Sequence, residues 1–135
     1  MSTYQIYAYF CKMRLKINTK ILELNLLNTK TAEIISKSSN FRSSINTWGD
    51  EIYFKTPIKA IKLEANSRDI INFGEVAYWV EGNSIAIGFG KTPASINNEI
   101  RLVSRVNIWA KFNTEIFNTD FFRCLNDDDL IDLLN

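Results

Sequence analysis

Histidine, a side chain that many active sites rely on, does not occur in this 135-residue chain. Without an imidazole there is no histidine general base, no serine–histidine or cysteine–histidine nucleophile pair and no histidine metal ligand. The two cysteines, Cys11 and Cys124, are far apart and match no metal or redox spacing, so we expect reduced thiols. The sequence therefore predicts no cofactor and no metal, and it favours a protein that is not an enzyme.

Two groups of polar residues still resemble chemical motifs. Asp50 and Glu51 are adjacent acids, but neighbours in a strand point to opposite faces and make a poor acid–base pair. Solvated or capping roles are predicted for both. Gly88, Gly90 and Lys91 are similar to an anion-binding turn, yet their spacing matches no phosphate-loop motif. A bulge or a tight corner is the expected reason for the two glycines.

Aromatic side chains are the remaining residues that can form a binding surface. Trp48, Tyr78 and Trp79 can supply contact area at low entropic cost, and Phe89 belongs to the same predicted hairpin. The alternative is that they pack inside the protein. Because Tyr78 and Trp79 are neighbours in a predicted strand, they point to opposite faces, and at least one should lie in the core. The others are predicted to border a groove for a peptide or a small ligand.

The elements that position these residues are mostly strands. Alternating apolar residues predict strands near 4–10, 13–17, 21–26, 52–54, 77–80, 84–89 and 105–112, with a hairpin turn at 18–20. A short helix should begin near Thr29. A second helix is predicted over 126–134, capped by Asn126 and with Leu130, Leu133 and Leu134 on one face. Strands at this spacing indicate a closed barrel or a sandwich.

The bulk properties predict one domain and give little indication of a partner. The length is near the modal domain size, and the net charge of +1 gives no steering toward nucleic acid or a membrane. Residues 1–49 carry seven basic and two acidic side chains, whereas residues 112–135 carry one and six. We interpret this asymmetry as attraction between neighbouring chain ends. No signal peptide or membrane span is evident, so a cytoplasmic location is expected.

Several segments carry a resemblance to a known family: NTWGDEIYF at 46–54, TP at 56–57, GEVAYW at 74–79, GFGKTP at 88–93 and VNI at 106–108. Over residues 13–112 the chain resembles a small family of uncharacterised prokaryotic cyclophilin-like proteins. The resemblance implies an all-β, closed barrel of about eight strands with one or two short capping helices. From the length we expect a single domain over 1–135, in which residues 1–12 are an N-terminal extension and 113–135 an acidic, helix-containing tail, two segments that the resemblance does not cover. No activity is implied.

Cyclophilins themselves isomerise prolyl peptide bonds with an arginine from an F-H-R segment, and the nearest analogue here is Arg42 after Phe41. The intervening histidine is missing, and segments 84–88 and 92–96 lack the aromatic and histidine residues of the cyclophilin pocket. We therefore interpret the protein as a non-catalytic module that binds a peptide or small ligand through Arg42 and the four aromatic residues. The alternatives are a weak or divergent isomerase that uses Arg42, and an assembly protein in which residues 4–10 add a strand to another copy.

Overall fold

The computed structural model describes residues 12–135, so the predicted strand at 4–10 and Cys11 lie outside the described residues. The elements in chain order are β1 (Lys12–Ile17), β2 (Lys20–Leu26), α2 (Lys30–Ser36), β3 (Phe41–Ser44), β4 (Asn46–Thr47), β5 (Glu51–Lys55), β6 (Arg68–Ile71), β7 (Glu75–Trp79), β8 (Ser84–Gly88), β9 (Ile100–Lys111), α3 (Thr119–Arg123) and β10 (Leu130–Leu134).

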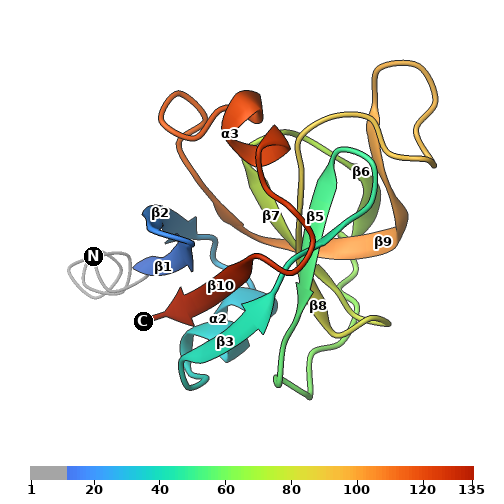
Figure 1. The fold of residues 1–135 in the computed structure, drawn as a ribbon. Coiled ribbons are helices and arrows are strands. Elements are labelled where there is room, and N and C mark those ends of the chain that lie inside the picture. The colour runs from blue at the N-terminus through green and yellow to red at the C-terminus, as the bar shows by residue number, and fades with distance from the viewer. Residues whose placement is uncertain (1–11) are drawn as a thin grey trace.

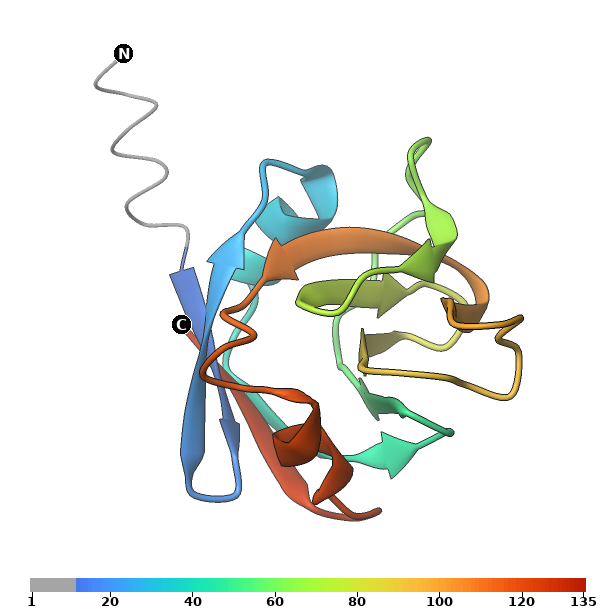
Figure 2. The ribbon, with the colours of Figure 1, turned by 90° about the horizontal axis from the view of Figure 1, so that it is seen from above.

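The strands form a nearly closed antiparallel barrel. Their order is β3-β10-β1-β2-β9-β7-β8-β5-β4, and β6 pairs separately with β9. The two end strands, β3 and β4, are separated only by Ile45, whose N–H donates to Asp129 and whose carbonyl accepts from Asp128, each at 2.8 Å. In Figures 1 and 2 the strands surround one interior. The all-β, cyclophilin-like barrel expected from the sequence is confirmed.

Side-chain alternation explains the first hairpin. Met13, Leu15 and Ile17 of β1 are buried, and the residues between them are exposed. Pairing of β1 with β2 begins at Ile17 and Lys20, so the turn falls where it was predicted. Asn18 takes a φ of 55°, a left-handed conformation that asparagine tolerates better than most residues. The period-two pattern therefore fixes which face of the hairpin enters the barrel.

Apolar side chains form two separate cores. The larger one, the barrel core, fills the interior and includes Phe54, Tyr78 and Trp109. The smaller one, which we name the outer core, lies on the other face of β5, β7 and β8, where β6 and the first half of β9 pack. Its members are Tyr53, Ile71, Ala77, Trp79, Ala86, Ile100, Leu102, Val106 and Ile108.

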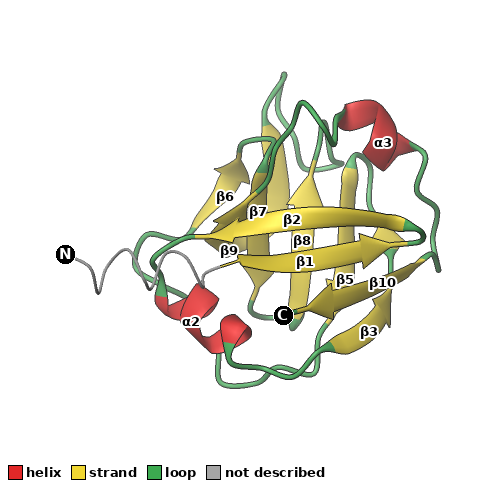
Figure 3. Ribbon diagram, turned by 90° about the vertical axis from the view of Figure 1, so that its left-hand side faces the viewer, coloured by secondary structure: helices red, strands yellow, loops and turns green. Residues whose placement is uncertain are grey.

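The two short helices lie at opposite ends of the barrel (Figure 3). Helix α2 is capped by Thr29, whose side chain accepts a hydrogen bond from the N–H of Ala32 at 3.0 Å, which confirms the predicted helix start. Helix α3 is capped by Asn118 and buries Phe122 at its end of the barrel. Among residues 12–135, no helix is long and apolar enough to cross a membrane.

The predicted helix over 126–134 is wrong, because residues 130–134 form strand β10. Ile131 and Leu133 lie opposite Ile17 and Leu15 of β1 and are buried, whereas Leu130 is exposed. The leucine spacing is compatible with a helix or a strand. The segment forms a strand because β1 and β3 pair with it, one on each side. This placement sets the acidic end beside the basic one, with Asp132 opposite Lys16, and confirms the predicted attraction of the chain ends.

Candidate functional site

Two of the five residues predicted to line a groove are buried in the barrel core. Tyr78 is fully buried, and its hydroxyl is hydrogen-bonded with Thr56 at 3.2 Å and with Asn83 at 3.0 Å. Phe89 is buried and stacks on Phe122 of α3 with ring centroids 5.6 Å apart. These side chains seal the interior, so neither offers a face to a ligand from solvent.

Trp79 lies on the opposite face from Tyr78, in the outer core, so the expectation that at least one of this pair is in the core is confirmed. Its ring meets that of Tyr53 edge-on, with centroids 6.0 Å apart and an interplanar angle of 89°. The indole Nε1 of Trp79 is buried and has no hydrogen-bond partner among the described residues. Tyr53 and Trp79 thus form an aromatic pair on this face, and the indole N–H of Trp79 is a hydrogen-bond donor without an acceptor among the described residues.

Arg42 and Trp48 lie in β3 and in the turn after β4. The guanidinium of Arg42 makes a two-point contact with Asp132, Nε to Oδ1 at 2.8 Å and NH2 to Oδ2 at 3.2 Å. This contact raises the pKa of Arg42 and lowers the pKa of Asp132. The backbone N–H of Trp48 donates to the carbonyl of Glu51 at 2.9 Å. The structure therefore does not bring the five predicted residues together.

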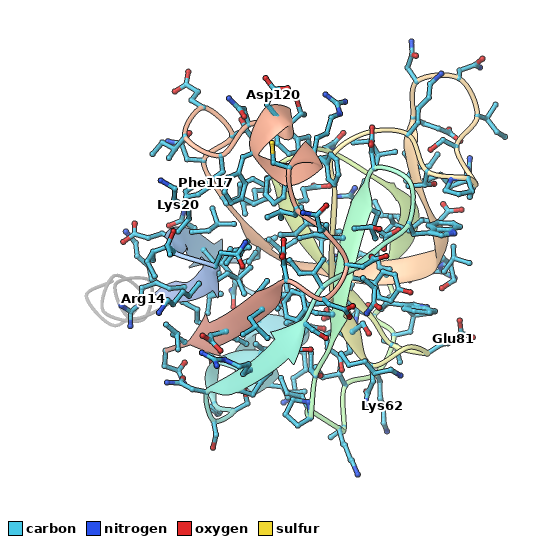
Figure 4. The ribbon with its side chains drawn as sticks, in the orientation of Figure 1. Arg14, Lys20, Lys62, Glu81, Phe117 and Asp120 are labelled. Carbon is cyan, nitrogen blue, oxygen red and sulfur yellow. The ribbon has the colours of Figure 1, made fainter. Side chains whose placement is uncertain are left out.

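Three grooves on the described surface are lined by none of those five residues. One of these grooves, with a volume of about 520 Å³ and a lining of both polar and apolar residues, lies between the β1–β2 hairpin and the segment before α3. Its lining includes Ile21, Glu23, Asn113, Ile116 and Phe117, the last of which is labelled in Figure 4. These polar residues sit on the surface, so this groove contains no buried polar group that would specify a ligand.

The most unusual polar group of the described chain is instead the carboxyl of Glu51, the first residue of β5. Only 6% of Glu51 is exposed, and its Oε1 has no hydrogen-bond partner among residues 12–135. Buried polar groups in folded proteins nearly always have a partner, and leaving one without costs about 1–3 kcal/mol. An unpartnered acid at this position therefore requires an explanation.

The strand register places the Glu51 side chain beside the outer core. Residues 52 and 54 point into the barrel core and residue 53 into the outer core, so residue 51 shares the face of Tyr53. Glu51 pairs with Gly88. A β-carbon on Gly88 would stand 2.6 Å from Ile100 and 3.1 Å from Ile71. The carboxyl is thus flanked by a glycine that lets two isoleucines pack close to the strand.

Burial in these surroundings raises the pKa of the Glu51 carboxyl to about 8. Removal from water penalises the charged form, and no neighbouring cation offsets this penalty. At neutral pH the side chain is therefore a neutral acid that can donate a hydrogen bond. A group with this combination of burial and altered acidity is a common mark of a functional site.

A second buried acid on the same sheet, Glu75, is held in the ionised state. Arg68 makes a two-point contact with Glu75, at 2.6 and 3.0 Å, and the N–H of Asn72 donates to the same carboxylate at 2.7 Å. Burial raises the pKa of Glu75, but these bonds and the attraction of Arg68 and Lys111 outweigh burial and leave it below its ordinary value. The Glu75 carboxylate thus has hydrogen-bond partners within the protein, whereas Oε1 of Glu51 has none among the described residues.

Glu51 also stands at the last rung of the β5–β8 ladder, where the barrel opens toward α3. Beyond this rung the N–H of Asp50 donates to the carbonyl of Lys91 at 2.8 Å, and the N–H of Phe89 donates to the carbonyl of Asp50 at 2.7 Å. The side chain of Asp50 pairs with Arg123 of α3 at 3.4 Å. Glu51 therefore lies next to the contact between the 48–50 turn and the 89–93 segment.

Sequence reasoning set Glu51 aside as a solvated or capping residue, and the burial of its side chain contradicts that interpretation. One signal was present. Glu51 begins the run EIYF, in which three consecutive apolar residues indicate a strand covered on both faces. An acid on such a strand is predicted to be buried whichever way it points.

Comparisons with known proteins agree with this architecture. A family model described as cyclophilin-like matches residues 11–127. The solution structure of the hypothetical protein AF2241 from Archaeoglobus fulgidus is similar over 91% of this chain and 92% of that one, with 31% identity and a TM-score of 0.73. The structure of McbB in complex with tryptophan is similar over 91% of this chain and 44% of that one, with 11% identity and a TM-score of 0.68. Comparison with curated proteins gave no match.

Proposed function

Because the chain belongs to the cyclophilin-like family, whose fold does not specify a reaction, we propose a function from the site alone: a small-ligand-binding module anchored by Glu51. The observation that carries the proposal is the buried Glu51 side chain on the outer face of β5, whose Oε1 has no hydrogen-bond partner among residues 12–135. Binding sites combine apolar walls with a few polar groups that fix orientation. Here the outer core supplies the wall, and Glu51 supplies the polar group.

Binding is a better match to this site than catalysis. A paired acid–base mechanism needs a second titratable group within hydrogen-bond reach of the reacting atoms. Glu75 is committed to Arg68, and the chain has no histidine. The Arg42 guanidinium, which an isomerase would aim at a proline amide, is engaged with Asp132 on the strands β3 and β10. A carboxyl with no chemical partner is suited to holding a ligand.

Because only 6% of Glu51 is exposed, binding needs a local opening, and we infer that this opening occurs at the neighbouring contact between the 48–50 turn and the 89–93 segment. Two backbone hydrogen bonds join these segments. Thr92 also donates to the carbonyl of Arg101 and anchors the segment on its other side. A ligand that binds here should therefore perturb residues 48–51 and 88–93 together.

L-tryptophan is a rational first probe, because the structurally similar McbB was solved with it. We expect two-dimensional NMR of isotope-labelled protein to show tryptophan-dependent shifts at residues 48–55 and 84–93. Replacing Glu51→Leu, which removes both polar atoms from a side chain of similar size, should weaken binding by about 10-fold, the size expected when a buried hydrogen-bonding group is lost. The matched control is Glu81→Leu, at an exposed acid of the β7–β8 turn labelled in Figure 4, which should leave affinity unchanged.

Two outcomes would count against the proposal. Shifts confined to residues 21–25 and 113–117 would assign tryptophan to the groove beside the first hairpin. Equal affinities for the wild-type chain and Glu51→Leu would show that the buried acid does not contact the ligand.

A further inference from the structure

We propose that the ligand of the Glu51 site is an organic cation, whose protonated amine pairs with the Glu51 carboxylate while its apolar body lies against the outer core. This inference rests on the proposed function and specifies the class of ligand. It follows from the charges around the site, the apolar groups that flank it and the two aromatic rings that share its face.

Two of the basic side chains around the outer core, Arg68 and Arg101, are engaged in ion pairs, and Arg105 and Lys111 of β9 are exposed. Arg68 of β6 pairs with Glu75 of β7 at 2.6 Å. Arg101 of β9 pairs with Asp69 and with Glu99, each at 2.6 Å. Among the described residues, no basic side chain of β6, β7 or β9 forms an ion pair with Glu51, and none offsets the effect of burial on its carboxyl.

The remaining charged groups near Glu51 are committed elsewhere or exposed. Arg123 of α3 pairs with Asp50, the residue before Glu51. Lys55, at the far end of β5, donates to the carbonyl of Gly82 at 3.4 Å, and Lys91 is exposed. On β8 the facing residues are Ser84, Ala86 and Gly88, none of which titrates. Two species can therefore neutralise a buried Glu51 carboxylate: a proton or a cation brought by a ligand.

The walls of the site favour a cation attached to an apolar body. Ile71 and Ile100 pack close to Gly88, directly across the ladder from Glu51. Tyr53 and Trp79 lie further along the same face, and aromatic ring faces attract ammonium groups. An anionic ligand would meet Glu51 with no cation to receive it. A neutral hydrocarbon would leave the carboxyl without a partner.

Binding of such a cation exchanges one positive species for another. The free site holds a proton on Glu51, because burial raises the pKa of the carboxyl to about 8. An amine that arrives protonated pairs with the carboxylate, and the carboxyl proton leaves for solvent. The site is neutral before and after binding. About one proton should therefore be released per ligand at a pH below that titration.

The experiment compares tryptamine with indole-3-propionate, two indoles that differ chiefly in the sign of their charge. Isothermal titration calorimetry of the full chain, at about pH 6.5 in two buffers of different ionisation enthalpy, measures affinity and proton release together. We expect tryptamine to bind at least about 10-fold more tightly than indole-3-propionate and to release about one proton. Glu51→Gln should abolish the proton release, and Glu81→Gln should retain it.

The outcomes separate this inference from the proposed function. Tighter binding of indole-3-propionate, with NMR shifts at 48–55 and 84–93, overturns the cation and leaves ligand binding at Glu51 standing. The third compound tested is a lysine with blocked backbone termini. If neither of the two indoles nor this lysine derivative shifts those residues, both the cation and ligand binding at Glu51 are overturned. If the lysine derivative binds in place of tryptamine and releases a proton, the cation is supported and its source is a peptide side chain.

Discussion

At the scale of single residues, Glu51 should make the stability of the protein fall as pH rises. The carboxyl titrates near 4.5 in the unfolded chain and at about 8 in the folded one. Between these values the unfolded chain releases a proton that the folded chain keeps, so the free energy of unfolding decreases by at most about 1.4 kcal/mol per pH unit. Glutamine mimics the neutral acid. In urea denaturation, Glu51→Gln should gain roughly 2–4 kcal/mol relative to wild type between pH 5 and pH 8.

Glu75 provides a control of opposite sign on the same sheet. Its folded-state pKa lies below the ordinary value, so its contribution to stability is present at neutral pH and is lost as pH falls through that folded-state value. Glu75→Gln should destabilise the protein at neutral pH, because Arg68 loses its partner, and the loss of unfolding free energy should shrink in acid.

For Glu51, the contrary outcome is an unfolding free energy that changes with pH in the same way for wild type and Glu51→Gln between pH 5 and pH 8. That result would show that the Glu51 carboxyl is ionised in the folded protein.

At the scale of elements, alanine substitutions in β10 distinguish a strand from the helix that the leucine spacing favours. Ile131 is 1% exposed and Leu130 is 49% exposed. Ile131→Ala should therefore cost about 2–5 kcal/mol of unfolding free energy and Leu130→Ala less than about 1 kcal/mol. A helix would reverse this order, since residues 130, 133 and 134 would share its buried face. Chemical denaturation of the two variants measures the difference directly.

The fold was largely predictable because its strongest local signals agree with its tertiary structure. The alternation at 13–17 and 21–26 and the cap at Thr29 require no distant partner to be interpreted, and each is found as predicted. Strand β10 was not predictable, because its state depends on β1 and β3, which are distant in sequence. The candidate site was missed although the run EIYF indicates a strand covered on both faces. The run does not show what covers Glu51, because residues 71 and 100, which pack around Gly88, are distant in sequence.

At the scale of the whole molecule, the two ends of the chain close the barrel. β10 lies between β1 and β3, and Asp132 contacts Arg42 while lying opposite Lys16. Both long edges of β1 are thereby paired within residues 12–135, with β10 on one side and β2 on the other. The pairing that holds the barrel together on this side consequently needs nothing from residues 1–11.

A chain that lacks residues 1–11 should keep the fold of residues 12–135, because the strand pairs and both cores described above are contained there. The segment 4–10 is rich in aromatic residues and carries no charge, so we expect it to mediate self-association instead. Light scattering should then give more chains per particle for the full chain than for the deletion variant, with unchanged circular dichroism. Equal numbers of chains for the two proteins would remove the assembly role, and a loss of structure on deletion would mean that the segment belongs to the barrel.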